Sequence, residues 1–168
     1  MTTPAWALSL IYWLHMLATV AWIGALSTLA ILVLPAARQA LEAEAYAALL
    51  QKVRRRLDSL GWLCLVVLAG TGLFQMSANP NYQGFLSVSN RWALAILLKH
   101  LLFLAMAGVS AYLTWGLLPN LQRLALRLAQ GQDVPGSQRL WRQEATLIRL
   151  NLVLGVFVLA LTAVARAA

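Results

Sequence analysis

The chain has 168 residues, of which 61% are apolar and only 11% are charged. Soluble domains are roughly half apolar and a quarter charged, so this composition excludes an ordinary soluble globular domain, and the length predicts a single domain, residues 1–168. The formal net charge of +8 does not indicate nucleic acid as a partner, because most of the positive side chains gather in two short segments, 35–57 and 119–143.

Four long apolar runs cover about 5–34, 59–77, 92–118 and 144–165. A hydrocarbon core about 30 Å thick needs about 20 helical residues, and a chain that crosses lipid must satisfy its backbone hydrogen bonds internally. The sequence therefore predicts an all-α fold, an integral membrane four-helix up-down bundle.

The basic segments between these runs predict the orientation of the bundle. The positive-inside rule places both of them in the cytoplasm, so both termini and the 78–91 loop are expected outside. Apolar residues at helical spacing within 36–57 predict a short amphipathic helix at the cytoplasmic surface, and 119–143 starts in the same way.

The chain contains a pattern that occurs twice. When His15 is aligned with His100, Pro35 falls within one residue of Pro119. Each histidine is followed by an apolar stretch, a proline, a basic segment and another membrane helix. This pattern predicts a 2+2 internal repeat about an axis along the membrane normal, although few residues are identical and a chance likeness is the alternative.

The chain has two histidines, and both lie inside apolar runs. His15 lies roughly 15 Å and His100 roughly 14 Å from the outer ends of their helices, which are diagonal neighbours in an up-down bundle. Ionisable groups inside a membrane are costly and usually functional. We therefore predict that both imidazoles are axial ligands of a haem b, because its flat ring would fill the gap. Histidines that merely bridge helices in a structural subunit are the alternative.

Small and aromatic residues share helix faces with the histidines. Trp22 lies seven residues after His15, and Ala107 and Gly108 lie seven and eight residues after His100. The small residues would leave room for a macrocycle, although membrane helices also use such residues simply to pack closely.

Two basic residues near the outer end of the third run complete the candidate site. Arg91 would meet haem propionates, and Lys99 would either snorkel outward or pair with a propionate or a quinone oxygen. The expected function is electron transfer or a place in a membrane redox complex. Partners would be lipid and a quinone, other membrane subunits or a second copy. No catalytic residue stands out, and whether the chain is an enzyme stays open. The candidate cofactor-binding residues are His15, His100, Lys99, Arg91, Trp22, Ala107 and Gly108.

Copper is the alternative metal, because Cu(I) binds imidazole and thioether groups. Met16 and Met106 lie off the histidine faces, and Met76 lies nearer the outer surface. No Met-x-x-Met or Cys-x-x-Cys spacing is present. The lone Cys64 is expected to be a small buried side chain.

The acidic residues give no hydrolytic motif. They all fall in the basic segments or at helix ends, so hydrolysis of the kind seen in soluble enzymes is not expected. These residues are Glu42, Glu44, Asp58, Asp133 and Glu144.

Several stretches together resemble the membrane domain of the CopD (copper resistance protein D) family. They are LHMLATVAWIGAL running on to LP at 34–35, Arg56 with TG at 71–72, and RWALAILLKHLLFLAMAGVSAY leading into LLPNL at 117–121. The resemblance implies a four-helix unit in the bacterial plasma (inner) membrane with a role in copper homeostasis or uptake.

Overall fold

The computed structural model describes residues 4–86, 88–132, 134 and 136–167, and within this part of the chain every regular element is a helix. The elements are α1 (Ala5–Ser27), η1 (Thr28–Val33), α2 (Leu34–Ala40), α3 (Ala43–Ser77), α4 (Arg91–Ala111), η2 (Tyr112–Leu117), α5 (Leu118–Ala129) and α6 (Ser137–Ala167). α1, η1 and α2 form one continuous rod, and α4, η2 and α5 form another. With α3 and α6 they give four rods that are long and apolar enough to cross a membrane, which confirms the predicted four-helix membrane fold.

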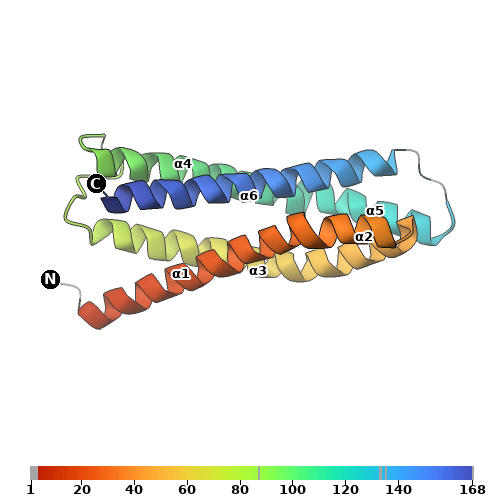
Figure 1. Cartoon of the computed structure of the whole chain (residues 1–168), viewed down its shortest axis with the longest axis horizontal. Helices are drawn as coiled ribbons and strands as arrows, with labels where there is room; N and C mark the ends of the chain where they lie inside the picture. The colour runs from red at the N-terminus through yellow and green to blue at the C-terminus, as the bar shows by residue number, and fades with distance from the viewer. Residues whose placement is uncertain (1–3, 87, 133, 135, 168) are drawn as a thin grey trace.

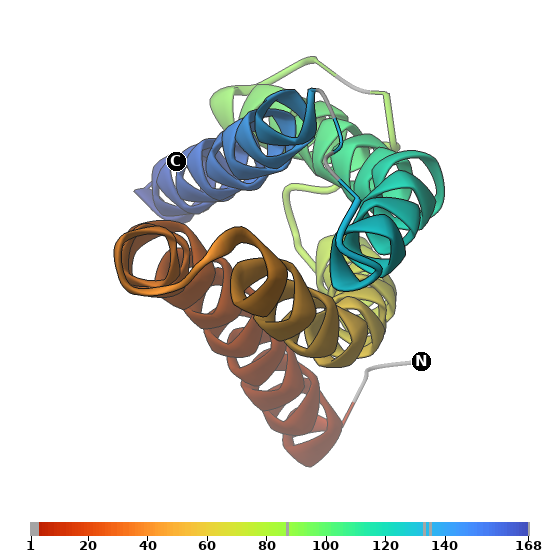
Figure 2. The ribbon, with the colours of Figure 1, turned by 90° about the vertical axis from the view of Figure 1, so that its right-hand side faces the viewer.

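The four rods form an up-down bundle of two pairs (Figure 1). α1 packs against α3 and α4 packs against α6, and the pairs meet through contacts of α1 with α6 and of α3 with α5. α1 and α4 therefore lie diagonally opposite, as Figure 2 shows. The start of α1, the end of α6 and the loop between α3 and α4 share one end of the bundle. The other end carries segments 35–57 and 119–143, and we call it the basic end.

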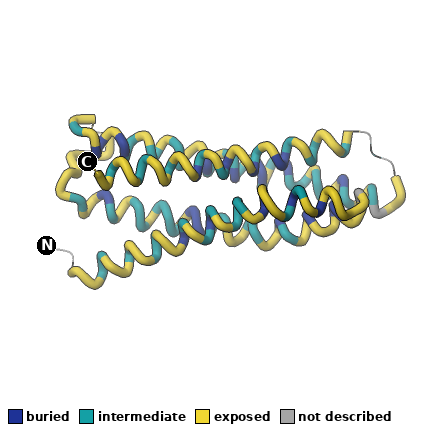
Figure 3. The backbone as a smooth tube through the Cα atoms, viewed as in Figure 1, coloured by how far each residue is buried: buried dark blue, intermediate teal, exposed yellow. Residues whose placement is uncertain are grey.

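Large apolar side chains are exposed along all four rods. Val20, Leu63, Leu104 and Phe157 are each more than half exposed, and exposed positions run along the outside of every helix in Figure 3. An apolar surface of this extent is unsuited to water and fits lipid contact. The chain is therefore a multi-pass membrane protein.

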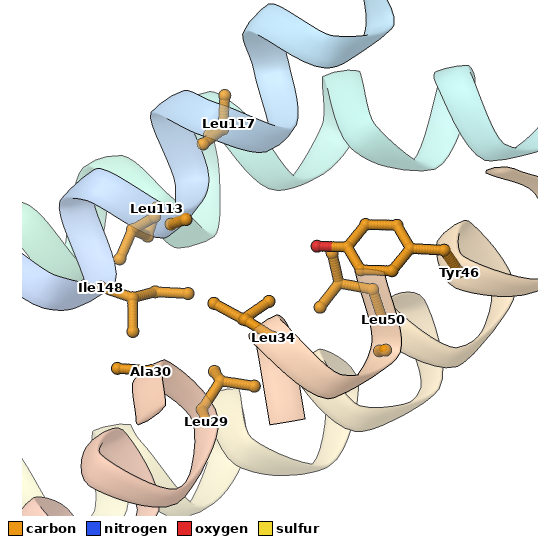
Figure 4. Packing of buried hydrophobic residues seen from close by; sticks show 10 residues of the cluster. Leu29, Ala30, Leu34, Tyr46, Leu50, Leu113, Leu117 and Ile148 are labelled. Carbon is orange, nitrogen blue, oxygen red and sulfur yellow. The ribbon is translucent and has the colours of Figure 1, made fainter. Parts of the chain in front are cut away.

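The largest buried cluster joins the two pairs towards the basic end (Figure 4). Leu34 and Leu50 from one pair meet Leu113, Leu117 and Ile148 from the other. These side chains are all at most 6% exposed. This packing fixes how the pairs are placed relative to each other.

The two prolines have the same effect on their helices. Proline has no N–H, and its ring clashes with the carbonyl four residues earlier, so a regular α-helix cannot continue through it unchanged. A six-residue π-helical segment relieves this conflict before each Leu-Pro pair. In η1 the N–H of Leu34 donates to the carbonyl of Leu29, and in η2 the N–H of Leu118 donates to that of Leu113. This parallel supports the predicted two-helix repeat.

The helices extend further at the basic end than the apolar runs suggested. Instead of a separate surface helix over 36–57, the first rod continues to Ala40, the backbone is extended at Leu41 and Glu42, and α3 then runs unbroken for 35 residues. Good helix formers fill the start of α3 without a strong breaker, so the amphipathic segment and the membrane segment join. α5 likewise extends α4. Rods of 31 to 38 residues are about 46–57 Å long, well beyond a hydrocarbon core.

Candidate functional site

His15 on α1 is held by a side chain of α3. Its Nδ1 lies 2.7 Å from Thr71 Oγ1. The Thr71 hydroxyl donates its own proton to the carbonyl of Val67, so Thr71 Oγ1 accepts a hydrogen bond from His15 Nδ1–H. Gly72 allows this approach, because a Cβ atom at that position would stand only 3.5 Å from the imidazole. The proton on Nδ1 leaves the lone pair of the neutral ring on Nε2.

His100 on α4 has the same tautomer. Its Nδ1–H donates to the carbonyl of Ile96, one turn earlier, at 2.7 Å. The edge of Phe85, from the loop between α3 and α4, packs on the ring with the centroids 5.1 Å apart. A neutral imidazole with an Nδ1–H bound to a carbonyl or hydroxyl is the usual state of a metal-ligating histidine. Both histidines thus have the free Nε2 that a metal requires, and metal binding by them stays a prediction.

Met76 lies in the same part of the bundle as both histidines. It shares a face of α3 with Gly72, one turn away, and Gly72 faces His15. It is buried with Trp92 and Ala93, and Ile96 packs against this cluster. Ile96 in turn shares a face of α4 with His100. Met76 is 7% exposed, so it belongs to the interior of the bundle.

The other two methionines among the described residues behave differently. Met16 is 65% exposed and faces the surroundings of the bundle. Met106 is buried in another cluster with Cys64 and Trp22. Cys64 is buried, as predicted.

Two cationic residues take different places near the histidines. Lys99 is partly buried, and its charge acts on His15 across the bundle. The charge of Arg166, near the end of α6, acts on Lys99, and this guanidinium lies 5.5 Å from the centre of the Tyr12 ring. Arg91 is the first residue of α4 and is exposed. Lys99 therefore faces the bundle, whereas Arg91 marks its end.

The residues expected to cradle a macrocycle do not gather at the histidines. Trp22 is buried against Gly61, about 10 Å further along α1 than His15. Ala107 is partly buried. Gly108 is exposed, and a Cβ atom there would meet nothing within 4 Å. The small residues thus do not line a slot beside His100, and the haem b hypothesis, with its electron-transfer role, gains no support.

A cavity with a mostly apolar lining and a few polar side chains lies nearer the basic end, where the sequence suggested no site. It measures about 50 Å³, and its walls include neither histidine. Its polar and reactive lining residues are Trp22, Arg54, Asp58, Cys64, Ser110 and Asn151.

An ion pair lies beside this cavity. Arg54 Nε is 3.4 Å from Glu144 Oε1, and both side chains are almost fully buried. The prediction that Glu144 lies in a basic segment or at a helix end is therefore wrong, because α6 already begins at Ser137 and Glu144 is buried in the bundle. Asp133 lies outside the described residues. The spacing of Glu144, Ile148 and Asn151 on one helix face was the signal that could have revealed this buried polar strip.

Two further polar contacts complete the lining. Asn151 Nδ2 donates to Ser110 Oγ at 2.9 Å, and the Thr114 hydroxyl donates to Asp58. Within the described residues, no group of three or more histidine, cysteine or acidic side chains is arranged to hold a metal ion.

Comparison with known proteins identifies the family. No curated protein and no solved structure matches the chain. The family model described as copper resistance protein D matches residues 51–165, which is more than half of the chain. The match includes Cys64, His100 and Asn151 and begins after His15. Together with the four membrane helices, it shows that the chain belongs to the copper resistance protein D (CopD) family.

Proposed function

We propose that this protein binds copper within the membrane, as Cu(I), and passes it on. The ligands are His15 Nε2, His100 Nε2 and the thioether of Met76, which we call the histidine site. The observation that carries the proposal is the shared tautomer. Both imidazoles are fixed through Nδ1, and each keeps its Nε2 lone pair for a metal.

The chemistry of these ligands suits Cu(I). Imidazole and thioether groups are neutral and soft enough to favour Cu(I) over hard divalent cations. All three ligand residues come from different rods, so a bound ion would link α1, α3 and α4. Family membership points to the same metal.

Lys99 would limit how tightly the site holds its cargo. Its positive charge acts on His15, and like charges repel more strongly in a membrane interior than in water. An ion that is to be passed on must bind favourably enough to enter and weakly enough to leave. Neutral ligands beside a fixed cation meet both conditions.

The test is Cu(I) affinity, measured on the purified full chain in detergent by competition with a Cu(I)-specific chromophoric chelator. His15→Ala and His100→Ala should each weaken binding by roughly 100-fold or more, since even the loss of an outer hydrogen-bond partner costs about 10–100-fold. Met76→Leu should weaken binding less, because it removes one thioether and keeps a similar volume.

Met16→Leu is the matched control. It is the same substitution one residue from His15, on an exposed side chain, and should leave the affinity unchanged. Copper binding that survives both histidine replacements would refute the proposed site. Copper binding lost equally in Met16→Leu would show that the effects come from general damage to the fold.

A further inference from the structure

Several buried polar atoms lack a hydrogen-bond partner, and they lie together. Among the described residues these atoms are Trp22 Nε1, Arg54 Nε, both carboxylate oxygens of Glu144, and Asn151 Oδ1. Each of these four residues lines one of two cavities. Buried polar groups are nearly always satisfied by protein or water, above all inside a membrane.

The two cavities lie one after the other along the length of the bundle. The smaller one, about 10 Å³, is lined by Gln51, Gln122 and Glu144 near the basic end. The larger one, about 50 Å³, lies further in and ends at Trp22 and Cys64. Arg54 lines both, so the two cavities adjoin at this buried side chain.

The volumes fit a few water molecules. A cavity holds a water when it offers roughly 10–15 Å³ for the molecule together with polar partners. The smaller cavity therefore has room for about one water, and the larger for about three or four.

The buried polar atoms without a partner require a bound molecule that both donates and accepts hydrogen bonds. The Trp22 N–H needs an acceptor, whereas Asn151 Oδ1 needs a donor, because the Asn151 amide nitrogen already donates to Ser110. A metal cation cannot accept a hydrogen bond from Trp22. An apolar molecule would leave all of these atoms without a hydrogen-bond partner. Water satisfies both kinds of atom.

We propose that the two cavities form a water-filled half-channel, which brings water and protons from the basic end as far as Trp22 and Cys64. The ionisable groups along it are Arg54, Asp58 and Glu144, and the charge of Arg38 also acts on Glu144. The half-channel gives the carboxyl groups of Asp58 and Glu144 access to protons from one side only. This inference does not depend on copper binding.

A dry cluster closes the inner end of the half-channel. Ala18, Leu65 and Met106 pack with Trp22 and Cys64, and Ala18 lies on α1 between Trp22 and His15. Water therefore stops short of the histidine site, and no continuous water path crosses the bundle there.

The test is hydroxyl-radical footprinting by radiolysis, with mass spectrometry, on the full chain in lipid nanodiscs. Radicals formed from bound water oxidise the side chains next to it. Trp22 and Trp92 form a matched pair, because both are 7% exposed but only Trp22 lines either of these two cavities. Trp22 should be oxidised severalfold faster than Trp92. Equal rates would overturn the proposal.

A cavity-filling variant sharpens the result. Ala25 lines the larger cavity, so Ala25→Leu should expel water and bring the oxidation rate of Trp22 down to that of Trp92. Gly24→Leu adds more bulk at the exposed neighbouring position and should leave the rate unchanged. A folded Ala25→Leu protein with an unchanged Trp22 rate would also overturn the proposal. If Ala25→Leu does not fold, the wild-type comparison of the two tryptophans decides alone.

Discussion

Thr71 should control copper affinity without touching the metal. Its hydroxyl accepts the Nδ1 proton of His15 and so keeps the lone pair on Nε2. Thr71→Val keeps the shape of the side chain and removes this acceptor. In the variant, the His15 proton either stays on Nδ1 without a partner or moves to Nε2, where it blocks the metal.

Two independent estimates give the size of the effect. Losing an outer hydrogen-bond partner of a metal-ligating histidine costs about 10–100-fold in affinity, which is about 1.4–2.7 kcal/mol. Leaving a buried donor unsatisfied costs about 1–3 kcal/mol. We therefore expect Thr71→Val to weaken Cu(I) binding by roughly 10–100-fold, which is less than the loss of His15 itself.

The assay is the chelator competition described above, with two controls. Thr71→Ser keeps the hydroxyl and should bind as the wild type does. Thr162→Val removes another partly buried hydroxyl, one that donates to Val158 on its own helix, and should have no effect. The reasoning is refuted if Thr71→Val binds Cu(I) like the wild type while His15→Ala does not, or if Thr71→Ser loses as much affinity as Thr71→Val.

Further substitutions test the charges and the packing. Arg54→Met leaves Glu144 buried without its partner and should lower the free energy of unfolding by about 3 kcal/mol, or the midpoint of thermal unfolding in detergent by roughly 6–12 °C. The double variant with Glu144→Leu should recover most of this stability. Equal losses in the single and double variants would contradict the coupling. Lys99→Met removes a positive charge that acts on His15. Because like charges repel, Cu(I) affinity should rise. An unchanged affinity would count against a copper ion near Lys99. In Gly61→Ala the new Cβ would stand 2.8 Å from the Trp22 ring. The free energy of unfolding should therefore fall by about 1–3 kcal/mol, and the oxidation of Trp22 should change. If neither changes, the Trp22 ring moves aside freely.

The sequence by itself determined the four membrane rods and their up-down order. A hydrocarbon layer requires long apolar helices, and such helices can be recognised in the sequence as long apolar runs. Matching the segments that begin at His15 and His100 also pointed to the repeat, which the paired π-helical segments before Pro35 and Pro119 support. The ends of the rods could not be predicted from the apolar runs, because helix-forming residues continue the helices beyond these runs.

Only the tertiary structure decided what each side chain faces. Helical spacing tells which residues share a face, but the rotation of each helix about its own axis is set by packing against its neighbours. This rotation brings Thr71 to His15, turns Gly108 outward and buries Met76. It also carries Glu144 from a basic segment into the bundle beside Arg54. From the sequence alone, a charged residue beside a basic segment is expected to be exposed to water. Only the packing of the helices shows that the Glu144 carboxylate is buried.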